Sequence, residues 1–180
     1  MYVQRFLGSA WASVHGPKDP QKLLRSLLES DFAGLSASPS PRPIRWPDVR
    51  EAAADLPVRF PCVRASNPLA ERSALQALCS QSEWELAVAH GAIRDAIACA
   101  EVVGSEVVVL DLGVVGITGE IEAEDLGEPN YDWTHERAHA LLARRKIGRN
   151  AAVDRACREL FAAIKMFPDM HFCVTQGRRL

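Results

Sequence analysis

The stretch Ser82–Leu112, SEWELAVAHGAIRDAIACAEVVGSEVVVLDL, decides the fold class of this chain. Its first part spaces apolar residues three and four positions apart, which is typical of one face of a helix. That stripe consists of Leu86, His90, Ile93, Ile97 and Ala100. Gly104 ends the helical pattern, and residues 106–112 then form a continuous run rich in β-branched residues. Such a run is typical of a parallel strand that is covered on both faces.

The same alternation extends over the rest of the chain. Helices are predicted over residues 18–30, 46–56 and 151–167, and short strands over residues 6–13, 31–35, 57–63 and 170–174. The last helix places Val153, Cys157, Leu160, Ile164 and Phe167 on one face, which is therefore expected to be buried. Strands that alternate with helices predict an α/β domain with a parallel sheet, in strand order 1-2-3-4-5 and with right-handed helical crossovers.

Length and composition indicate one ordinary globular domain. The chain has 180 residues, of which 48% are hydrophobic and 24% charged, and its net charge is −2. These values exclude a disordered, collagen-like or disulfide-scaffold chain. The charge is unevenly distributed, because residues 101–134 contain nine acidic and no basic residues, whereas residues 135–180 contain ten basic and four acidic. We interpret these segments as two solvated surfaces that attract each other, with a basic docking face as the alternative.

The cysteines and the hydropathy pattern indicate a cytoplasmic protein. The cysteine count is odd and the sequence contains no C-x-x-C pair, so reduced thiols are expected rather than a disulfide framework or a zinc knuckle. No apolar stretch has the length of a membrane span, and residues 1–16 lack the pattern of a signal peptide. The five cysteines are Cys62, Cys79, Cys99, Cys157 and Cys173.

Three segments resemble the xylose-isomerase-like TIM barrels. They are HGAIRDAIACAEVVGSEVVVLDLG (residues 90–113), SDFAGLSAS (30–38) and VRFPCVRAS (58–66), which are similar to the approaches to that family's fourth, second and third strands. The family groups sugar isomerases, sugar-phosphate isomerase/epimerase relatives and the endonuclease IV class, also called AP endonuclease family 2. The resemblance implies a partial (β/α)8 barrel over residues 1–180, with about five parallel strands and without the last three.

In such barrels the chemistry takes place at the carboxyl ends of the strands. The resemblance therefore directs attention to the residues expected to follow each strand. Asp111 follows the fourth strand and is the candidate acid/base residue, because a carboxylate at the end of a buried strand either serves a site or is costly. The alternative for Asp111 is a carboxylate that accepts hydrogen bonds from loop amides. The candidate substrate-binding residues are His15, Arg64, Thr175 and Arg178.

The resemblance does not extend to the family's metal ligands. Arg64 stands where relatives of the endonuclease class show a His, and a cation there repels a metal ion. Asp111 replaces a second His, although a carboxylate can still ligate, and Thr175-Gln176 stands where a Glu is usual. We therefore predict a protein without a divalent metal and without a cofactor.

Other motifs favour structural roles. His90 lies on an apolar stripe and is expected to be a hydrogen-bonded core residue, and His135 and His139 have no third ligand nearby. The glycine run Gly113, Gly116, Gly119 precedes acidic residues rather than a helix, which disfavours phosphate binding there. Nucleic-acid binding is disfavoured, because the acidic segment adjoins the basic residues Arg144, Arg145, Lys146 and Arg149.

Two functional hypotheses follow. The first is a sugar or sugar-phosphate isomerase or epimerase that acts on a small polyol or sugar by proton transfer next to a carbonyl. The second is a non-catalytic, metal-free relative that binds a small polar ligand or a protein partner. Five strands leave two open sheet edges. We therefore also expect either self-association through these edges or a longer chain that supplies the missing units.

Overall fold

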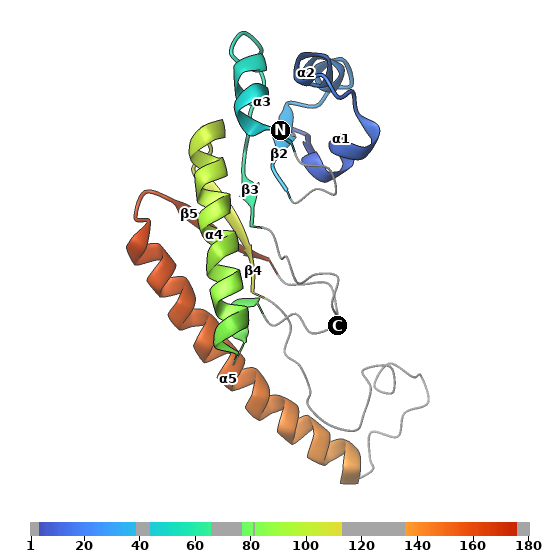
Figure 1. Cartoon of the computed structure of the whole chain (residues 1–180). Coiled ribbons are helices and arrows are strands. Elements are labelled where there is room, and N and C mark those ends of the chain that lie inside the picture. The colour runs from blue at the N-terminus through green and yellow to red at the C-terminus, as the bar shows by residue number, and fades with distance from the viewer. Residues whose placement is uncertain (1–3, 39–43, 66–76, 81, 113–135, 176–180) are drawn as a thin grey trace.

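The computed structural model describes residues 4–38, 44–65, 77–80, 82–112 and 136–175 (Figure 1). Strands and helices alternate along these residues, as predicted for an α/β protein. The strands are β1 (Phe6–Gly8), β2 (Gly34–Ser36), β3 (Val63–Arg64), β4 (Val107–Asp111) and β5 (His171–Thr175). The helices are α1 (Ser9–His15), α2 (Pro20–Glu29), α3 (Trp46–Ala52), α4 (Glu83–Val103) and α5 (Glu136–Met166), with a short 3₁₀ helix η1 (Ala77–Cys79) before α4.

All described strand pairs are parallel. β1 pairs with β2, and β3, β4 and β5 form a second sheet in that order. Two isolated parallel bridges, Gly34–Arg59 and Ala37–Val63, join the two sheets. The predicted neighbours β1–β2, β3–β4 and β4–β5 are therefore confirmed, whereas the predicted single sheet in the order 1-2-3-4-5 is divided into two sheets, because only isolated bridges connect β2 to the chain at β3. The handedness of the crossovers and the curvature of a barrel stay predictions.

The third strand is shorter than predicted. Of residues 57–63 only Val63 belongs to the ladder, and Arg59 makes an isolated bridge. Pro57 and Pro61 lack an N–H group, and proline is therefore rare within a continuous ladder. The backbone still bonds across the junction, since Leu35 N–H donates to the Arg59 carbonyl (3.0 Å) and Arg64 N–H to the Ala37 carbonyl (2.7 Å).

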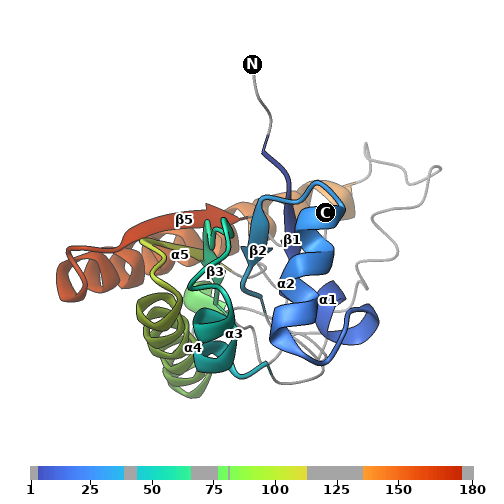
Figure 2. The same cartoon turned by 90° about the horizontal axis from the view of Figure 1, so that it is seen from above.

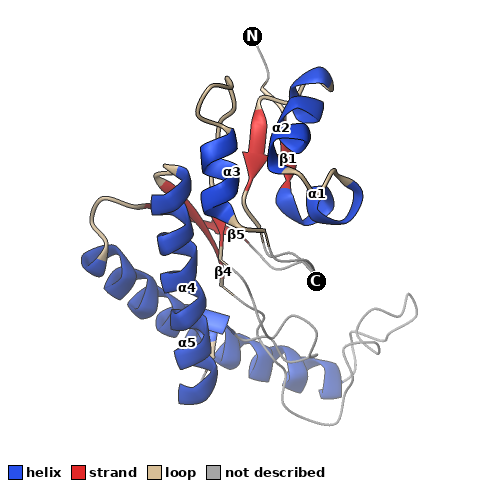
Figure 3. Cartoon of the chain, turned by 45° about the horizontal axis from the view of Figure 1, so that its top comes forward, coloured by secondary structure: helices blue, strands red, loops and turns tan. Residues whose placement is uncertain are grey.

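The core lies between one face of the strands and the helices. Helix α4 packs against β3 and β4 (Figure 3), and α3 lies beside α4 (Figure 2). The strands contribute buried residues at alternate positions, and the helices contribute apolar stripes. This cluster includes Leu24, Leu27, Leu35, Val49, Val63, Ile93, Ile97, Val108 and Leu110.

Helix α4 begins and ends as the sequence predicts. The Ser82 side chain accepts a hydrogen bond from Glu85 N–H, which caps the first turn. At the other end, Gly104 adopts the left-handed conformation with φ 72°, which L-residues with a side chain rarely occupy. The helix therefore stops where β4 has to start.

Strand β4 is buried on one face only, which corrects the expectation of a strand covered on both faces. Val108 and Leu110 are buried, whereas Val107, Val109 and Asp111 are half-buried. The run of β-branched residues favours a strand whatever covers it, so the sequence did not distinguish the two cases.

Helix α5 is longer than predicted and buries a different face. It spans 31 residues, and its first half extends past the end of α4 (Figure 1). Ala152, Ala156 and Ala163 are buried. Among the residues of the predicted stripe, Leu160 and Phe167 pack against the core, but Val153, Cys157 and Ile164 are exposed. The prediction was therefore wrong for three of the five positions.

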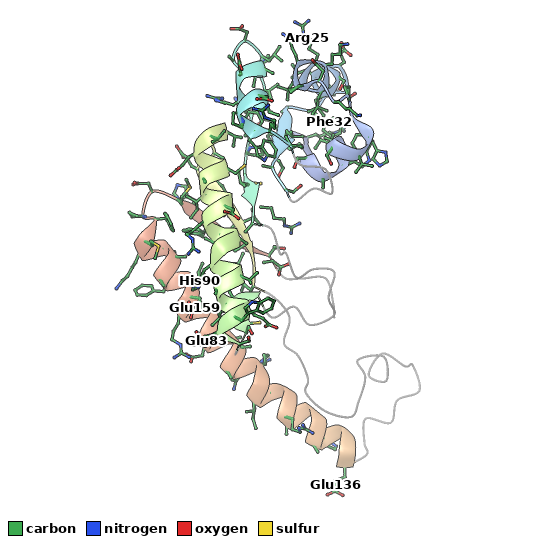
Figure 4. The ribbon with its side chains drawn as sticks, in the orientation of Figure 1. Arg25, Phe32, Glu83, His90, Glu136 and Glu159 are labelled. Atoms are coloured by element: carbon green, nitrogen blue, oxygen red, sulfur yellow. The ribbon has the colours of Figure 1, made fainter. Side chains whose placement is uncertain are left out.

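Polar contacts fasten α5 to α4. The His90 ring lies 3.0 Å from a Glu159 carboxylate oxygen, and Figure 4 shows the two side chains facing each other between the helices. Arg155 donates to Glu83 at 2.7 Å. The expected hydrogen bond of His90 is confirmed, although the residue is half-buried rather than in the core. None of the helices in the described ranges is both long and apolar enough to cross a bilayer.

Candidate functional site

The second face of the sheet carries polar side chains, and within the described residues helix α4 packs on the opposite face. Residues paired directly in a parallel register point to the same side, so the row Arg64–Val109–Cys173 faces away from buried Val63 and Val108. We call this side the open face. Its described residues include Ser36, Cys62, Arg64, Val107, Val109, Asp111, Cys173 and Thr175.

Three of the residues predicted from the sequence come together on the open face. Arg64 comes from β3 and donates a hydrogen bond to the Thr175 hydroxyl of β5 at 3.5 Å. Strand β4 lies between these two strands, and Asp111 of β4 is the register partner of Thr175. Arg64 is exposed, whereas Asp111 and Thr175 are half-buried. A cation, a carboxylate and a hydroxyl thus share the carboxyl edge of three adjacent strands.

Cys79 is a neighbour of this edge that the sequence did not reveal. Its N–H donates to the Leu112 carbonyl at 3.3 Å, directly after β4, and its side chain is buried with Leu112, Ala152 and Ala156. Burial raises the pKa of the Cys79 thiol against the effect of a backbone hydrogen bond, and the carboxylates of Asp111 and Glu85 raise it further. The Cys79 thiol therefore stays neutral at pH 7.

Further polar contacts lie near the carboxyl ends of β1 and β2 and in the segment that precedes β3. Ser36 Oγ lies 3.1 Å from Cys62 Sγ on the open face. Buried Ser9 donates to the Ser38 carbonyl at 2.9 Å and accepts from Ser38 N–H at 2.7 Å. The serine pair fastens the start of α1 to the end of β2, so α1 lies at the carboxyl edge of the sheet.

The sequence predicts that His15 directly follows the first strand. The structure corrects this prediction. Strand β1 ends at Gly8, and residues 9–13 belong to α1 rather than to the strand. His15 occupies the last turn of that helix, exposed, with its ring centroid 5.0 Å from that of Trp11. It belongs to the carboxyl edge through α1. Arg178, His135 and the glycine run 113–119 lie outside the described residues.

The described side chains do not gather metal ligands. Within the described ranges, no group of three His, Cys, Asp or Glu residues is placed to hold a metal ion. The charged groups described at the edge are Arg64 and Asp111, a pair suited to an anion-bearing polar ligand rather than to a bare cation. The absence of a metal from the native protein stays a prediction.

Chemical modification of the cysteines tests how far each thiol is buried in the folded protein. Burial raises the pKa of Cys99 from its ordinary value of 9.0 to about 11, whereas Cys157 and Cys173 are exposed. A raised pKa lowers the fraction of reactive thiolate at pH 8, by about a hundredfold for two pH units. We expect iodoacetamide to modify Cys157 and Cys173 first and Cys99 about a hundredfold more slowly. Mass spectrometry of peptides measures the rate at each cysteine. Equal rates in the folded protein would contradict the half-buried position of Cys99 and the raised pKa of its thiol.

The described residues thus define an α/β protein with parallel strands and a polar carboxyl edge. Comparison of the chain with protein-family models and with curated proteins gives no match. The geometry of this edge and the resemblance of the three segments therefore point to the function of the chain.

Proposed function

We propose that this protein binds a small sugar or sugar phosphate at the carboxyl edge of its sheet and moves a proton next to the sugar's carbonyl, as isomerases and epimerases do. One observation carries the proposal: Arg64, Asp111 and Thr175 share the carboxyl edge of β3, β4 and β5. Ligands of parallel α/β folds bind at this edge, where the loops after the strands converge.

Arg64 and Thr175 would hold the anionic group of the ligand. A guanidinium group offers planar, paired donors that match phosphate and carboxylate, and a hydroxyl adds a further donor. The hydrogen bond between the two side chains places both donors together before a ligand arrives. Because Arg64 is exposed, its guanidinium can turn from Thr175 toward a bound anion.

Asp111 would transfer the proton. A carboxylate removes a proton from the carbon beside the carbonyl to give an enediolate, and a proton moves between the two oxygens of that enediolate. The carboxyl group, whose proton exchanges with solvent, then protonates the former carbonyl carbon. No oxidant or reductant is required. Burial raises the pKa of the Cys79 thiol, which stays protonated at pH 7 and therefore does not compete with Asp111 as the base.

A partial (β/α)8 barrel and a cytoplasmic location belong to the same proposal. The barrel is supported by the parallel neighbours β1–β2 and β3–β4–β5 and by a helix between consecutive strands. A reducing compartment is supported by the cysteines, since all five lie in described ranges and none forms a disulfide.

The alternative function, a non-catalytic relative that binds a small polar ligand, is favoured by the exposed cation on the open face. Arg64 stands where the resemblance implies a metal-binding His, and its guanidinium binds anions without any catalytic step. Both functions require binding at the same edge, so proton exchange separates them.

The test combines binding with proton exchange. Pentose and hexose phosphates are titrated by calorimetry, and deuterium uptake at the carbon beside the carbonyl is followed by NMR in heavy water. We expect Arg64→Ala to weaken binding of the phosphorylated sugars by about 10- to 100-fold, the range for a hydrogen bond to a charged group. Asp111→Asn should retain binding and lose deuterium exchange by about 100-fold or more.

Arg59→Ala is the matched control, because Arg59 is also an exposed arginine before β3 but bonds to Gln4, 3.4 Å away. It should change neither readout. Binding without deuterium uptake by the unmodified protein would establish the non-catalytic alternative. Failure of every sugar phosphate to bind would contradict the proposed isomerase or epimerase.

A further inference from the structure

We propose that the Arg64 guanidinium stabilises the enediolate that Asp111 generates, so that a side chain of the protein supplies the positive charge at the reacting oxygen. This role rests on the proposed function and goes beyond the binding of an anionic group. It concerns the carbonyl oxygen of the sugar, which is present in phosphorylated and unphosphorylated sugars alike.

The Arg64 side chain crosses β4 to reach Thr175. Strand β4 lies between β3 and β5, so Arg64 and Thr175 belong to strands that are two spacings, or about 10 Å, apart. The hydrogen bond from the guanidinium to the Thr175 hydroxyl, at 3.5 Å, therefore brings the guanidinium over the carboxyl end of β4. Asp111 is the last residue of that strand.

The guanidinium and the Asp111 carboxylate are consequently neighbours on the open face. Asp111 and Thr175 are partners in the parallel register, and such partners stand side by side at about 5 Å with their side chains on the same face. A guanidinium that bonds to the Thr175 hydroxyl is therefore within reach of a ligand that lies over Asp111. A cation and a base can thus contact neighbouring atoms of one small ligand.

Removal of the proton by Asp111 creates the charge that Arg64 would stabilise. The electron pair of the broken C–H bond forms a double bond to the carbonyl carbon, and an electron pair of the C=O bond moves onto the oxygen. The guanidinium donates hydrogen bonds to that negatively charged oxygen and keeps its own protons. Because these hydrogen bonds are stronger to the developing charge than to the neutral carbonyl, they accelerate the proton transfer.

The described groups at this edge suit a protein cation in that role. Arg64 stands where the resemblance implies a metal-binding His, and its positive charge repels a metal ion at the same place. A divalent ion and a guanidinium can both offset the charge of an enediolate oxygen. A guanidinium remains charged over the pH range in which proteins fold, so Arg64 offers this charge permanently.

Neutral sugars separate this role from the binding of an anionic group. Deuterium uptake at the carbon beside the carbonyl of dihydroxyacetone and erythrulose is followed by NMR in heavy water with excess EDTA. We expect Arg64→Gln to lower kcat for uptake by about 100-fold with little change in KM. This is the smaller end of the range for one donor at a developing negative oxygen, because water screens the exposed Arg64.

Two further variants control for charge and for position. Arg64→Lys keeps the charge without the planar donors and should exchange about tenfold faster than Arg64→Gln. Arg59→Gln removes an exposed arginine that bonds to Gln4 and should change neither kcat nor KM. Circular dichroism checks that each variant folds, as expected for substitutions of exposed side chains.

Binding of a hydroxamate gives a second readout that requires no turnover. Glycolohydroxamate has a planar, ionisable N–O group that resembles the enediolate, and glycolamide lacks it. In calorimetry with excess EDTA, the unmodified protein should bind the hydroxamate about a hundredfold more tightly than the amide, as expected for an analogue of a charged intermediate. Arg64→Gln should lose this preference.

The outcomes distinguish the role of Arg64 from the proposed function. Equal uptake by Arg64→Gln and the unmodified protein, loss of uptake in EDTA, or a hydroxamate preference that survives in Arg64→Gln would each overturn the role of Arg64 alone. If the unmodified protein exchanged no sugar, with or without EDTA, the proposed isomerase or epimerase would be wrong, and the role of Arg64 with it.

Discussion

Gly34→Ala is expected to lower the free energy of unfolding by at least about 3 kcal/mol, the upper range for overpacked positions. A Cβ atom at Gly34 would lie 1.9 Å from the Arg59 carbonyl oxygen and 2.8 Å from two further backbone atoms of Arg59. That carbonyl cannot move away freely, because it accepts the Leu35 N–H across the junction of the two sheets. Urea unfolding followed by circular dichroism measures the effect.

Gly91→Ala is the matched control for this substitution. Gly91 lies within α4, and a Cβ atom there would meet nothing within 4 Å. Alanine has the higher helix propensity, so this variant should be more stable by about 0.5–1 kcal/mol. If Gly34→Ala cost less than about 1 kcal/mol, the close contact between β2 and the chain at Arg59 would be wrong.

Leu110→Ala should cost about 2–5 kcal/mol of unfolding free energy, because a fully buried leucine leaves a cavity. Leu110 is 1% exposed and lies on the helix side of β4. Its neighbour Val109 points to the open face and is half-buried, so Val109→Ala should cost only about 1 kcal/mol. Thermal and urea unfolding of the two variants compare the two faces of one strand.

This pair of variants also reports on the open face itself. Equal losses at Leu110 and Val109 would mean that the open face is covered in solution, either by residues outside the described ranges or by another chain. A difference of several-fold would support a sheet with one helix-covered face.

The region around α4 and β4 was predictable because its signals are local. Ser82 caps the helix, Gly104 ends it, and the β-branched run that follows favours a strand. Helix α1 was not predictable in this way. Its residues continue an apolar run from β1, and its start is held by hydrogen bonds between Ser9 and Ser38, which are 29 residues apart.

The buried face of α5 could not be predicted from apolar periodicity. Large apolar residues mark the exposed stripe, whereas alanines fill the buried face and contribute little to a hydrophobic pattern. Close approach of α5 to Cys79 and Leu112 requires these small residues. Which of two apolar faces is buried therefore depends on the shape of the partner, which a single helix sequence does not contain.

The candidate site was predictable where it depends on strand ends. Arg64, Asp111 and Thr175 meet because parallel strands place their carboxyl ends on one edge. Cys79 was missed because η1 brings it to that edge from a connecting segment. Ser36 and Cys62 were missed because their contact depends on the irregular junction before β3.

Buried and polar residues alternate along β3 and β4. Selection for folding and selection for ligand binding therefore act on different residues of these strands. Val63, Val108 and Leu110 maintain the fold, whereas Arg64 and Asp111 contribute little to the core. Mutations at the second set can therefore alter ligand preference while the protein remains folded. A sheet of this kind can acquire new binding specificities over evolution by changing every other residue of its central strands.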